Sequence, residues 1–278
     1  MSQPVAPLAG RRVLVVGASR GIGAAVAHRM AADGAAVTLV GRDGMALANV
    51  LANLAEGDHR CVVADLSLPD GRSDLFAALS PNLNHLANPH HVVVLALRVR
   101  RPWAKLDSML GEDLVRAFAE NTEYIPPLIS ALLPAQRACG FGRWIALSSV
   151  MAEIGGAGQA AYVAQKCALE AMMRTLAIEE GRHGITANVV APGFIRTEGT
   201  ELAYQESVFQ ALSRSNVLGR AGTPEEVAHV VAMLAHPEGG YITGATIPVS
   251  GGVQLGWSID QVVKQAVRSL KGVDGDAV

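Results

Sequence analysis

The chain has 278 residues, of which 50% are hydrophobic and 17% charged, and its formal net charge at pH 7 is −2. This length suits one large α/β domain or two small ones, and the near-neutral charge excludes a protein that attracts nucleic acid or acidic membranes through a global field. The charged fraction lies below the roughly 25% of typical domains, so subunit contacts are expected on part of the surface.

The cysteines are odd in number and lack the spacing of a metal site: Cys61, Cys139 and Cys167. Unpaired thiols are typical of the reducing cytosol, so we expect a cytoplasmic protein. The first ten residues lack the apolar core of a signal peptide, and no apolar run approaches the roughly 18 residues of a membrane span. We therefore expect neither a metal nor a membrane partner.

Short β-branched runs alternate with alanine-rich stretches along the chain. Strands are predicted at residues 11–16, 35–40, 59–65, 91–97, 143–149, 185–192 and 245–250. Helices are predicted at 21–34, closed by Gly34, at 43–55, at 111–137 with a bend or an interruption near Pro126 and Pro127, and on the segment that contains Tyr162 and Lys166. Continuous apolar strands separated by helices indicate one α/β domain with a seven-stranded parallel sheet covered on both faces.

The first predicted strand runs into the sequence GASRGIG, within which the first predicted helix starts. Glycines at 17, 21 and 23 allow a tight turn and a close approach of backbone N–H groups to a pyrophosphate, which the positive end of the helix also favours. The spacing differs from the G-x-G-x-x-G fingerprint, and a glycine-rich turn without a ligand is the alternative. The strand before and the helix after favour a cofactor site formed by Gly17, Ser19, Arg20, Gly21, Ile22 and Gly23.

The end of the second predicted strand bears on the choice of cofactor. Gly41 stands where an NAD-binding protein of this kind has an acid for the ribose 2′-OH. Arg42 follows it and Arg20 lies in the glycine loop, and two guanidiniums suit the 2′-phosphate of NADP(H). Asp43 could be taken for the NAD acid, but its position one residue past the arginine favours a helix N-cap. The sequence therefore favours NADP(H).

Tyr162 and Lys166 interrupt an otherwise apolar helical stretch. Four residues are about one helical turn, so the two side chains are expected side by side on one face. A lysine stem lying on a tyrosine ring at a solvated edge would explain the pair by itself, so its meaning depends on the other motifs.

Those motifs, taken together, resemble the short-chain dehydrogenase/reductase family, most closely its β-ketoacyl-reductase-like members, over roughly residues 9–254. The resemblance rests on GASRGIG at 17–23, ADL at 64–66, Asn121, LSS at 147–149, YVAQK at 162–166, APGFIRT at 191–197 and YITGATIPVSGG at 241–252. The order of the motifs and the thirteen residues from Ser149 to Tyr162 make it specific. It implies a doubly wound Rossmann fold in which a nicotinamide cofactor exchanges hydride with a ketone or secondary alcohol.

The resemblance also implies a role for each of four residues. Tyr162 would protonate the carbonyl oxygen, and Ser149 would donate a hydrogen bond that polarises and positions it. Lys166 would place a positive charge near the phenol, which favours its ionised form, and would hold the nicotinamide ribose. Asn121 would anchor, through its backbone, a water that joins Lys166 to solvent. The chemistry agrees, because hydride delivery to a carbonyl creates an alkoxide that needs a positioned acid and a donor.

Further matches concern the cofactor and the assembly. Asp65 and Leu66 resemble the pair that contacts the adenine, although Asp65 alone would be an ordinary strand end. The segment that covers the nicotinamide would comprise Pro192, Gly193, Ile195 and Thr197, for which an ordinary turn is the alternative. The family resemblance implies a homotetramer, with a homodimer as the alternative.

The chain departs from the family after the fourth predicted strand, where Asn-Asn-Ala-Gly is absent and the sequence reads VVVLALRVRRPW. Arg98, Arg100 and Arg101 are either a solvated basic loop or a site for an anionic substrate tail or a carrier-protein phosphate. Residues 198–219 are expected to form a substrate lid whose apolar side suits an acyl, polyketide-like or ring ketone, with ordinary core packing as the alternative. That side comprises Leu202, Tyr204, Val208, Phe209 and Leu212.

Residues 258–270 have apolar side chains at helical spacing, which favours a packing or subunit-contact helix over a membrane anchor, and 271–278 is expected to be disordered. The sequence as a whole predicts an NADPH-dependent reductase of a small-molecule ketone, either free or acyl- or carrier-linked, without nucleic-acid or membrane partners. A family member that binds NADP(H) as a sensor or scaffold, with little turnover, is the alternative.

Overall fold

The computed structural model describes residues 6–83, 89–97 and 104–255, and for residues 80–83 it describes the backbone alone. Within these ranges seven strands form one sheet in the order β3-β2-β1-β4-β5-β6-β7. Every neighbouring pair is parallel. The strands are β1 (Arg12–Val16), β2 (Ala36–Gly41), β3 (Arg60–Val63), β4 (Val92–Leu95), β5 (Gly142–Leu147), β6 (Ile185–Pro192) and β7 (Thr246–Val249). The predicted doubly wound, seven-stranded parallel sheet in a single domain is confirmed.

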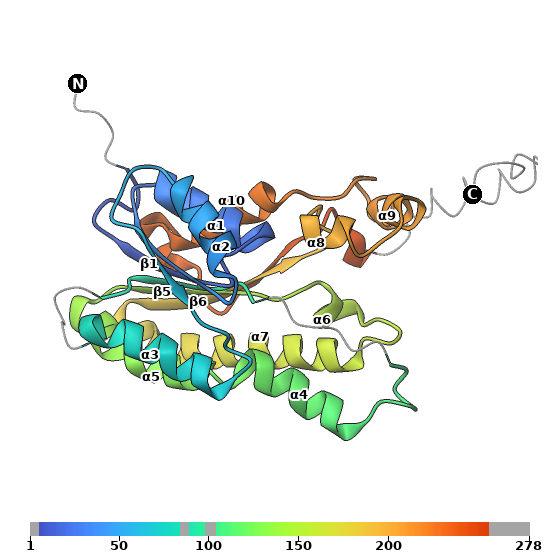
Figure 1. Ribbon diagram of the computed structural model, residues 1–278, viewed down its shortest axis with the longest axis horizontal. Coiled ribbons are helices and arrows are strands. Elements are labelled where there is room, and N and C mark those ends of the chain that lie inside the picture. The colour runs from blue at the N-terminus through green and yellow to red at the C-terminus, as the bar shows by residue number, and fades with distance from the viewer. Residues whose placement is uncertain (1–5, 84–88, 98–103, 256–278) are drawn as a thin grey trace, which may run out of the picture.

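Helices cover both faces of this sheet (Figure 1). One layer comprises α1 (Gly21–Ala32), α2 (Gly44–Ala52) and α10 (Pro224–Ala235). The other layer comprises α3 (Pro69–Leu83), α4 (Gly111–Thr122), α5 (Ile125–Cys139) and α7 (Ala160–Glu180). Three short helices lie outside these layers: α6 (Met151–Ile154), α8 (Glu198–Glu201) and α9 (Glu206–Ser213). No helix among the described residues is long and apolar enough to cross a membrane.

Strand β1 shows how the sequence builds two cores at once. Val13 and Val15 belong to the hydrophobic cluster under α1 and α10, whereas Leu14 and Val16 belong to the cluster under α3, α5 and α7. Successive side chains of a strand point to opposite faces, so a strand covered on both faces must be apolar throughout. The short run of valines in β4 is fully buried for the same reason.

The helix predicted at 111–137, with a bend or an interruption near Pro126 and Pro127, is interrupted, because the structure divides it into α4 and α5. Pro126 and Pro127 do not bend a continuous helix but stand in the first turn of α5. A proline there lacks only an N–H that would have no helical partner, so it favours a helix start.

Two of the helices that cover the sheet were not predicted from the sequence. Helix α3 has few apolar side chains at regular spacing, so its periodicity is weak. Helix α10 has a clear start signal in the sequence, because Thr223 and Glu226 form a capping box around Pro224. This helix packs against α1 and completes the upper layer.

Candidate active site

The glycine loop after β1 is shaped by close backbone contacts. Gly17 has φ +88°, and a Cβ built on it would lie 2.6 Å from the carbonyl oxygen of Ala96. A Cβ on Gly23 would lie 2.0 Å from the carbonyl oxygen of Gly17. Real Cβ atoms do not approach an oxygen so closely, so both positions require glycine for the first turn of α1 to fold onto the strand end.

The amino end of α1 has neither a side-chain cap nor an acidic residue in its first turn. Arg20 occupies the N-cap position without making a capping hydrogen bond, and the first turn contains no acidic residue. Helix N-termini leave backbone N–H groups without helical partners, and these favour negative charge. The loop that includes Ser19 and Ile22 therefore fits the pyrophosphate of a dinucleotide by its geometry and by its charge.

The segment after β6 comes next to this loop. A Cβ on Gly21 would lie 3.3 Å from the methyl group of Thr197. Thr197 caps α8 through a capping box with Thr200, and Ile195 pairs with Gly222 in an isolated bridge. Pro192 ends β6, and Gly193 leads from it into this segment. The structure thus brings the two predicted cofactor segments together, although they are far apart in the sequence.

Ser149, Tyr162 and Lys166 are all buried, with 7%, 7% and 4% of their surfaces exposed. Ser149 follows the end of β5, and the other two lie on α7. The Lys166 Nζ donates a 2.7 Å hydrogen bond to the carbonyl oxygen of Leu147 and lies 5.9 Å from the centre of the Tyr162 ring. Because both side chains are buried, the alternative of a tyrosine–lysine pair at a solvated edge is wrong.

One turn beyond Lys166, a further polar side chain binds the same strand end. The Ser148 hydroxyl donates a 2.6 Å hydrogen bond to the Glu170 carboxylate, and Thr246 of β7 donates to the same group at 3.5 Å. Glu170 therefore ties α7 to β5 and β7 beside Ser149. The sequence analysis did not single it out, although its spacing of four residues from Lys166 places it on the same helix face.

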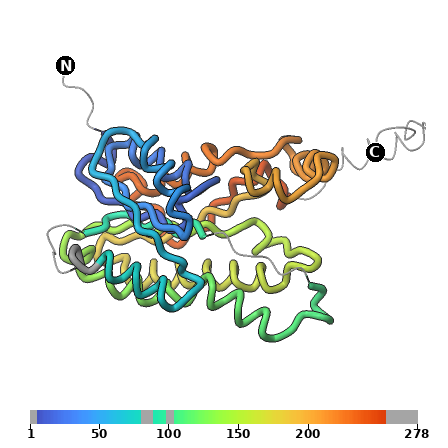
Figure 2. Tube along the Cα trace, in the orientation of Figure 1, coloured from blue at the N-terminus to red at the C-terminus, as the bar shows by residue number. Residues whose placement is uncertain are grey.

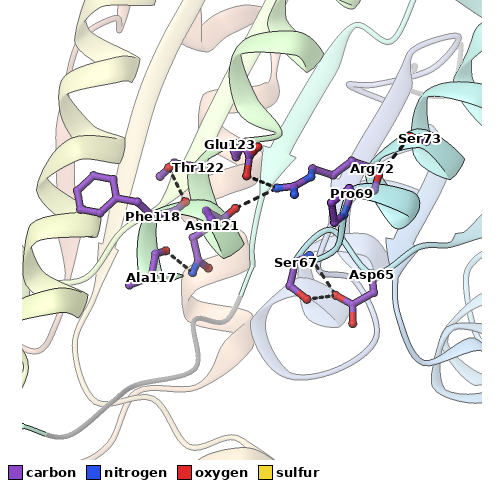
Figure 3. Close-up of polar contacts among 11 residues, drawn as sticks. Asp65, Ser67, Pro69, Arg72, Ser73, Ala117, Phe118, Asn121, Thr122 and Glu123 are labelled. Atoms are coloured by element: carbon purple, nitrogen blue, oxygen red, sulfur yellow. Dashed lines mark hydrogen bonds and ion pairs between the residues drawn. The ribbon is translucent and has the colours of Figure 1, made fainter. Parts of the chain in front are cut away.

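Asn121 lies in the last turn of α4, just before the short connection to α5. It is buried, with 5% of its surface exposed. Its side-chain amide donates to the carbonyl oxygen of Ala117 at 2.9 Å (Figure 3). Arg72 of α3 holds this helix end from the other side, donating to the Ala119 carbonyl oxygen at 3.2 Å and to Glu123 at 2.7 Å. No sequence signal pointed to Arg72, because its partners lie 47 and 51 residues away.

Asp65 follows β3 and folds into a local turn (Figure 3). One of its carboxylate oxygens accepts hydrogen bonds from the Ser67 hydroxyl at 2.6 Å and from the Ser67 N–H at 3.1 Å. The hydroxyl bond is the main cause that lowers the pKa of Asp65, and the positive charge of Arg42 adds to it. The neighbouring Leu66 side chain is 3% exposed and belongs to the core, so only its backbone remains for a cofactor.

Asp43 performs the predicted helix-capping role. One of its carboxylate oxygens accepts a 3.0 Å hydrogen bond from the Ala46 N–H at the start of α2. Its other oxygen forms an ion pair with Arg20 of the glycine loop. The Ala46 hydrogen bond is the largest cause that lowers the pKa of Asp43, and Arg20 contributes as well. Arg42, next to it, is exposed.

An open cavity of about 470 Å³ lies beside this ion pair. Ser19 and Arg20 line it from the loop, and Asn49 and Asn53 line it from α2. Gly41, which stands where NAD-binding proteins have an acid, is buried. A Cβ on Gly41 would lie 3.5 Å from the Ser19 Cβ. Gly41 therefore offers no charged group to this cavity, whereas Arg20 lines it as a cation and Glu198 of α8 as a carboxylate.

The predicted lid divides into two parts. Phe209 is 2% exposed and stacks edge-to-face on Phe194, with ring centres 5.1 Å apart, as core packing would have it. Leu202 and Val208 are exposed, at 81% and 44%. Figure 2 shows α8 and α9 (orange) extending beyond the sheet on the same side as the segment at 151–160. Arg98, Arg100, Arg101 and the predicted helix at 258–270 lie outside the described residues.

Comparison with known proteins identifies relatives along most of the chain. The family whose sequence model matches residues 17–254 is described as "Enoyl-(Acyl carrier protein) reductase". The short-chain reductase protein NovJ of Streptomyces niveus is 35% identical over 254 residues, covering 86% of this chain and 92% of that protein. The 3-oxoacyl-[acyl-carrier-protein] reductase FabG of Pseudomonas aeruginosa is 38% identical over 252 residues, covering 89% and 99%.

Solved structures give the same result. A 3-oxoacyl (acyl-carrier-protein) reductase from Agrobacterium tumefaciens, crystallised with NADP bound, superimposes with a TM-score of 0.80 at 28% identity. The superposition covers 89% of this chain and 96% of that one. The described fold is therefore shared over nearly the whole of the related protein.

Proposed function

Because the chain belongs to the short-chain dehydrogenase/reductase family of oxidoreductases, we propose that it reduces a ketone to a secondary alcohol with NADPH, and catalyses the reverse reaction. One observation carries this proposal. Lys166, on the same face of α7 as Tyr162, is hydrogen-bonded at 2.7 Å to the strand end that leads directly to Ser149. All three side chains are buried, so their polar groups act in a site of low dielectric constant, where electrostatic effects are strong.

In the proposed reaction Tyr162 and Ser149 act on the carbonyl oxygen of the substrate, and Lys166 acts on Tyr162. The Tyr162 hydroxyl donates the proton that the forming alkoxide requires, and the Ser149 hydroxyl donates a hydrogen bond to the same oxygen. The Lys166 ammonium lies 5.9 Å from the centre of the Tyr162 ring, so its positive charge attracts the negative charge that remains on the tyrosine oxygen after the proton transfer. When bound, the nicotinamide supplies the hydride. In the reverse direction Tyr162 accepts the proton.

The residues present fit a dinucleotide with a 2′-phosphate. The glycine loop, Asp65 and the segment from Pro192 to Thr197 would hold the pyrophosphate, adenine and nicotinamide ends. Arg20 and Arg42 would bind the 2′-phosphate through charge-assisted hydrogen bonds. Gly41, in place of an acid, removes the group that would hold a ribose 2′-OH and repel a phosphate. The Agrobacterium relative crystallised with NADP supports this choice.

For the substrate we propose a 3-oxoacyl, polyketide-like or ring ketone, free or linked to a carrier. The name of the Pseudomonas relative, a 3-oxoacyl-[acyl-carrier-protein] reductase, supports a 3-oxoacyl group linked to a carrier. The exposed Leu202 and Val208 add apolar surface next to the segment that would cover the nicotinamide.

The experiment is NADPH consumption, followed by loss of its absorbance, against 3-oxoacyl thioesters, ring ketones and simple ketones, with NADPH binding measured in parallel. We expect turnover of at least one class together with micromolar binding. NADPH binding without turnover of any of them would instead support a sensor or scaffold that uses the cofactor as a ligand.

A further inference from the structure

The ion pair between Arg20 and Asp43 lies where the proposed 2′-phosphate would bind. Arg20 belongs to the glycine loop and Asp43 to the amino end of α2, 23 residues later. The two side chains remain 54% and 37% exposed, so a ligand can reach them. Asp43 is held in place by its second contact, the hydrogen bond from the Ala46 N–H, whereas the long Arg20 side chain lines the open cavity.

The second arginine of this site also has an acidic neighbour. The positive charge of Arg42 is close enough to Asp65 to help hold the pKa of that carboxyl below its usual value. Two arginines would therefore meet the 2′-phosphate in the presence of two carboxylates, one of them in direct contact with Arg20. A phosphate that binds Arg20 must either displace Asp43 or lie beside it, and like charges at such short range repel.

We propose that Asp43 sets the cofactor preference of this protein: its carboxylate competes with the 2′-phosphate for Arg20 and so weakens the binding of NADPH but not of NADH. This inference rests on the proposed cofactor site. NADH has a 2′-hydroxyl in place of the phosphate, so it needs nothing from Arg20 and meets no added repulsion. Removal of the negative charge of Asp43 should raise the affinity for NADPH relative to the affinity for NADH.

The decisive variant is Asp43→Asn, since asparagine is as good an N-cap as aspartate and keeps the hydrogen bond that starts α2. An exposed ion pair changes an equilibrium by no more than about five-fold, so we expect a two- to five-fold lower Kd for NADPH, by cofactor fluorescence titration. The Kd for NADH should change less than two-fold. The gain should shrink as salt rises, because screening weakens interactions between exposed charges.

Two controls separate this mechanism from others. Glu225→Gln removes one exposed carboxylate from the first turn of α10 and should leave both affinities unchanged. Arg20→Ala in the Asp43→Asn background should abolish most of the gain if the carboxylate acts through Arg20. Thermal unfolding of each variant checks that the α2 cap is intact, and Asp43→Ser, with another capping side chain, provides a second test if asparagine lowers stability.

The outcomes distinguish the inference from the cofactor proposal. Unchanged or weaker NADPH binding in a stable Asp43→Asn protein overturns the inference, while a wild type that prefers NADPH still supports the cofactor proposal. A wild type that binds NADPH and NADH equally well contradicts the cofactor proposal. In that case the inference stands only if the Asp43→Asn variant binds NADPH more tightly than NADH. An equal gain for both cofactors would also overturn the inference, because it would not depend on the phosphate.

Discussion

The Lys166 ammonium donates a 2.7 Å hydrogen bond to the carbonyl oxygen of Leu147, the last residue of β5. This bond joins helix α7 to the strand end from which Ser149 projects two residues later. A buried ammonium is costly unless its protons are bound, so the contact stabilises the lysine in place. The contact therefore fixes helix α7, which contains the proposed acid, against the strand end that leads to the proposed donor.

Replacement of Tyr162 by phenylalanine tests the proposed acid. The ring remains to pack, but the proton donor is lost, so we expect activity to fall by at least the roughly 10²–10⁴-fold typical of general acid–base catalysis. NADPH binding should persist. Tyr241→Phe, on a fully exposed tyrosine, is the matched control and should retain wild-type turnover. Substantial turnover by the Tyr162 variant would contradict the assignment.

Replacement of Arg42 by alanine tests the 2′-phosphate site. Loss of a guanidinium–phosphate contact should cost roughly 1.5–3 kcal/mol, or about ten-fold or more in the Kd for NADPH. NADH binding should change little, because NADH lacks the phosphate. Arg116→Ala, which removes an exposed arginine from α4, serves as the control in the same titration. If both cofactors weaken equally, Arg42 does not bind the phosphate.

Replacement of Gly23 by alanine tests the packing of the glycine loop. A Cβ there would lie 2.0 Å from the Gly17 carbonyl oxygen, so the start of α1 must move. We expect a loss of about 1–3 kcal/mol in the free energy of unfolding, as for other overpacked sites, and weaker binding of NADPH and NADH alike. Gly111→Ala, where a Cβ meets open space, should be nearly neutral in thermal unfolding and in titration. Normal binding by the Gly23 variant would refute the close approach.

Replacement of Glu170 by alanine tests the link between α7 and the strand end. Ser148 loses its 2.6 Å acceptor, which should loosen the neighbouring Ser149 and lower kcat by up to about 10²-fold, with KM less affected. Glu170→Gln keeps an acceptor oxygen and should recover most of the rate. Glu179→Ala removes an exposed carboxylate from the same helix and is the control. A loss of stability without a change in kcat would indicate a purely structural role.

Assembly is open to a direct measurement. The low charged fraction and the family resemblance predict a homotetramer in which α4 and α7 pack across a two-fold axis. The exposed Val115 on α4 is apolar surface of the kind that a subunit contact buries, at 68% exposure in the single chain. Multi-angle light scattering at micromolar concentration should give the tetramer mass, and Val115→Glu should lower it. A wild-type monomer would contradict the prediction.

The features that the sequence determined by itself are those with local physical causes. Apolar strands bounded by turns, the glycines at 17, 21 and 23, and the four-residue spacing of Tyr162 and Lys166 each follow from short-range geometry. The N-cap role of Asp43 was predictable for the same reason, since a cap acts within one helical turn. Sequence periodicity was weakest for α3, where few apolar residues repeat.

The tertiary structure alone decided which distant polar groups meet. Asp43 faces Arg20 because β1 and β2 are adjacent and parallel, so that the loops after them share one edge of the sheet. Arg72 reaches the end of α4, and Ser148 reaches Glu170, only after α3, α4 and α7 have packed against the same face. Such pairings depend on the sum of many weak contacts across the whole fold, so they cannot be predicted from the spacing of residues in the sequence.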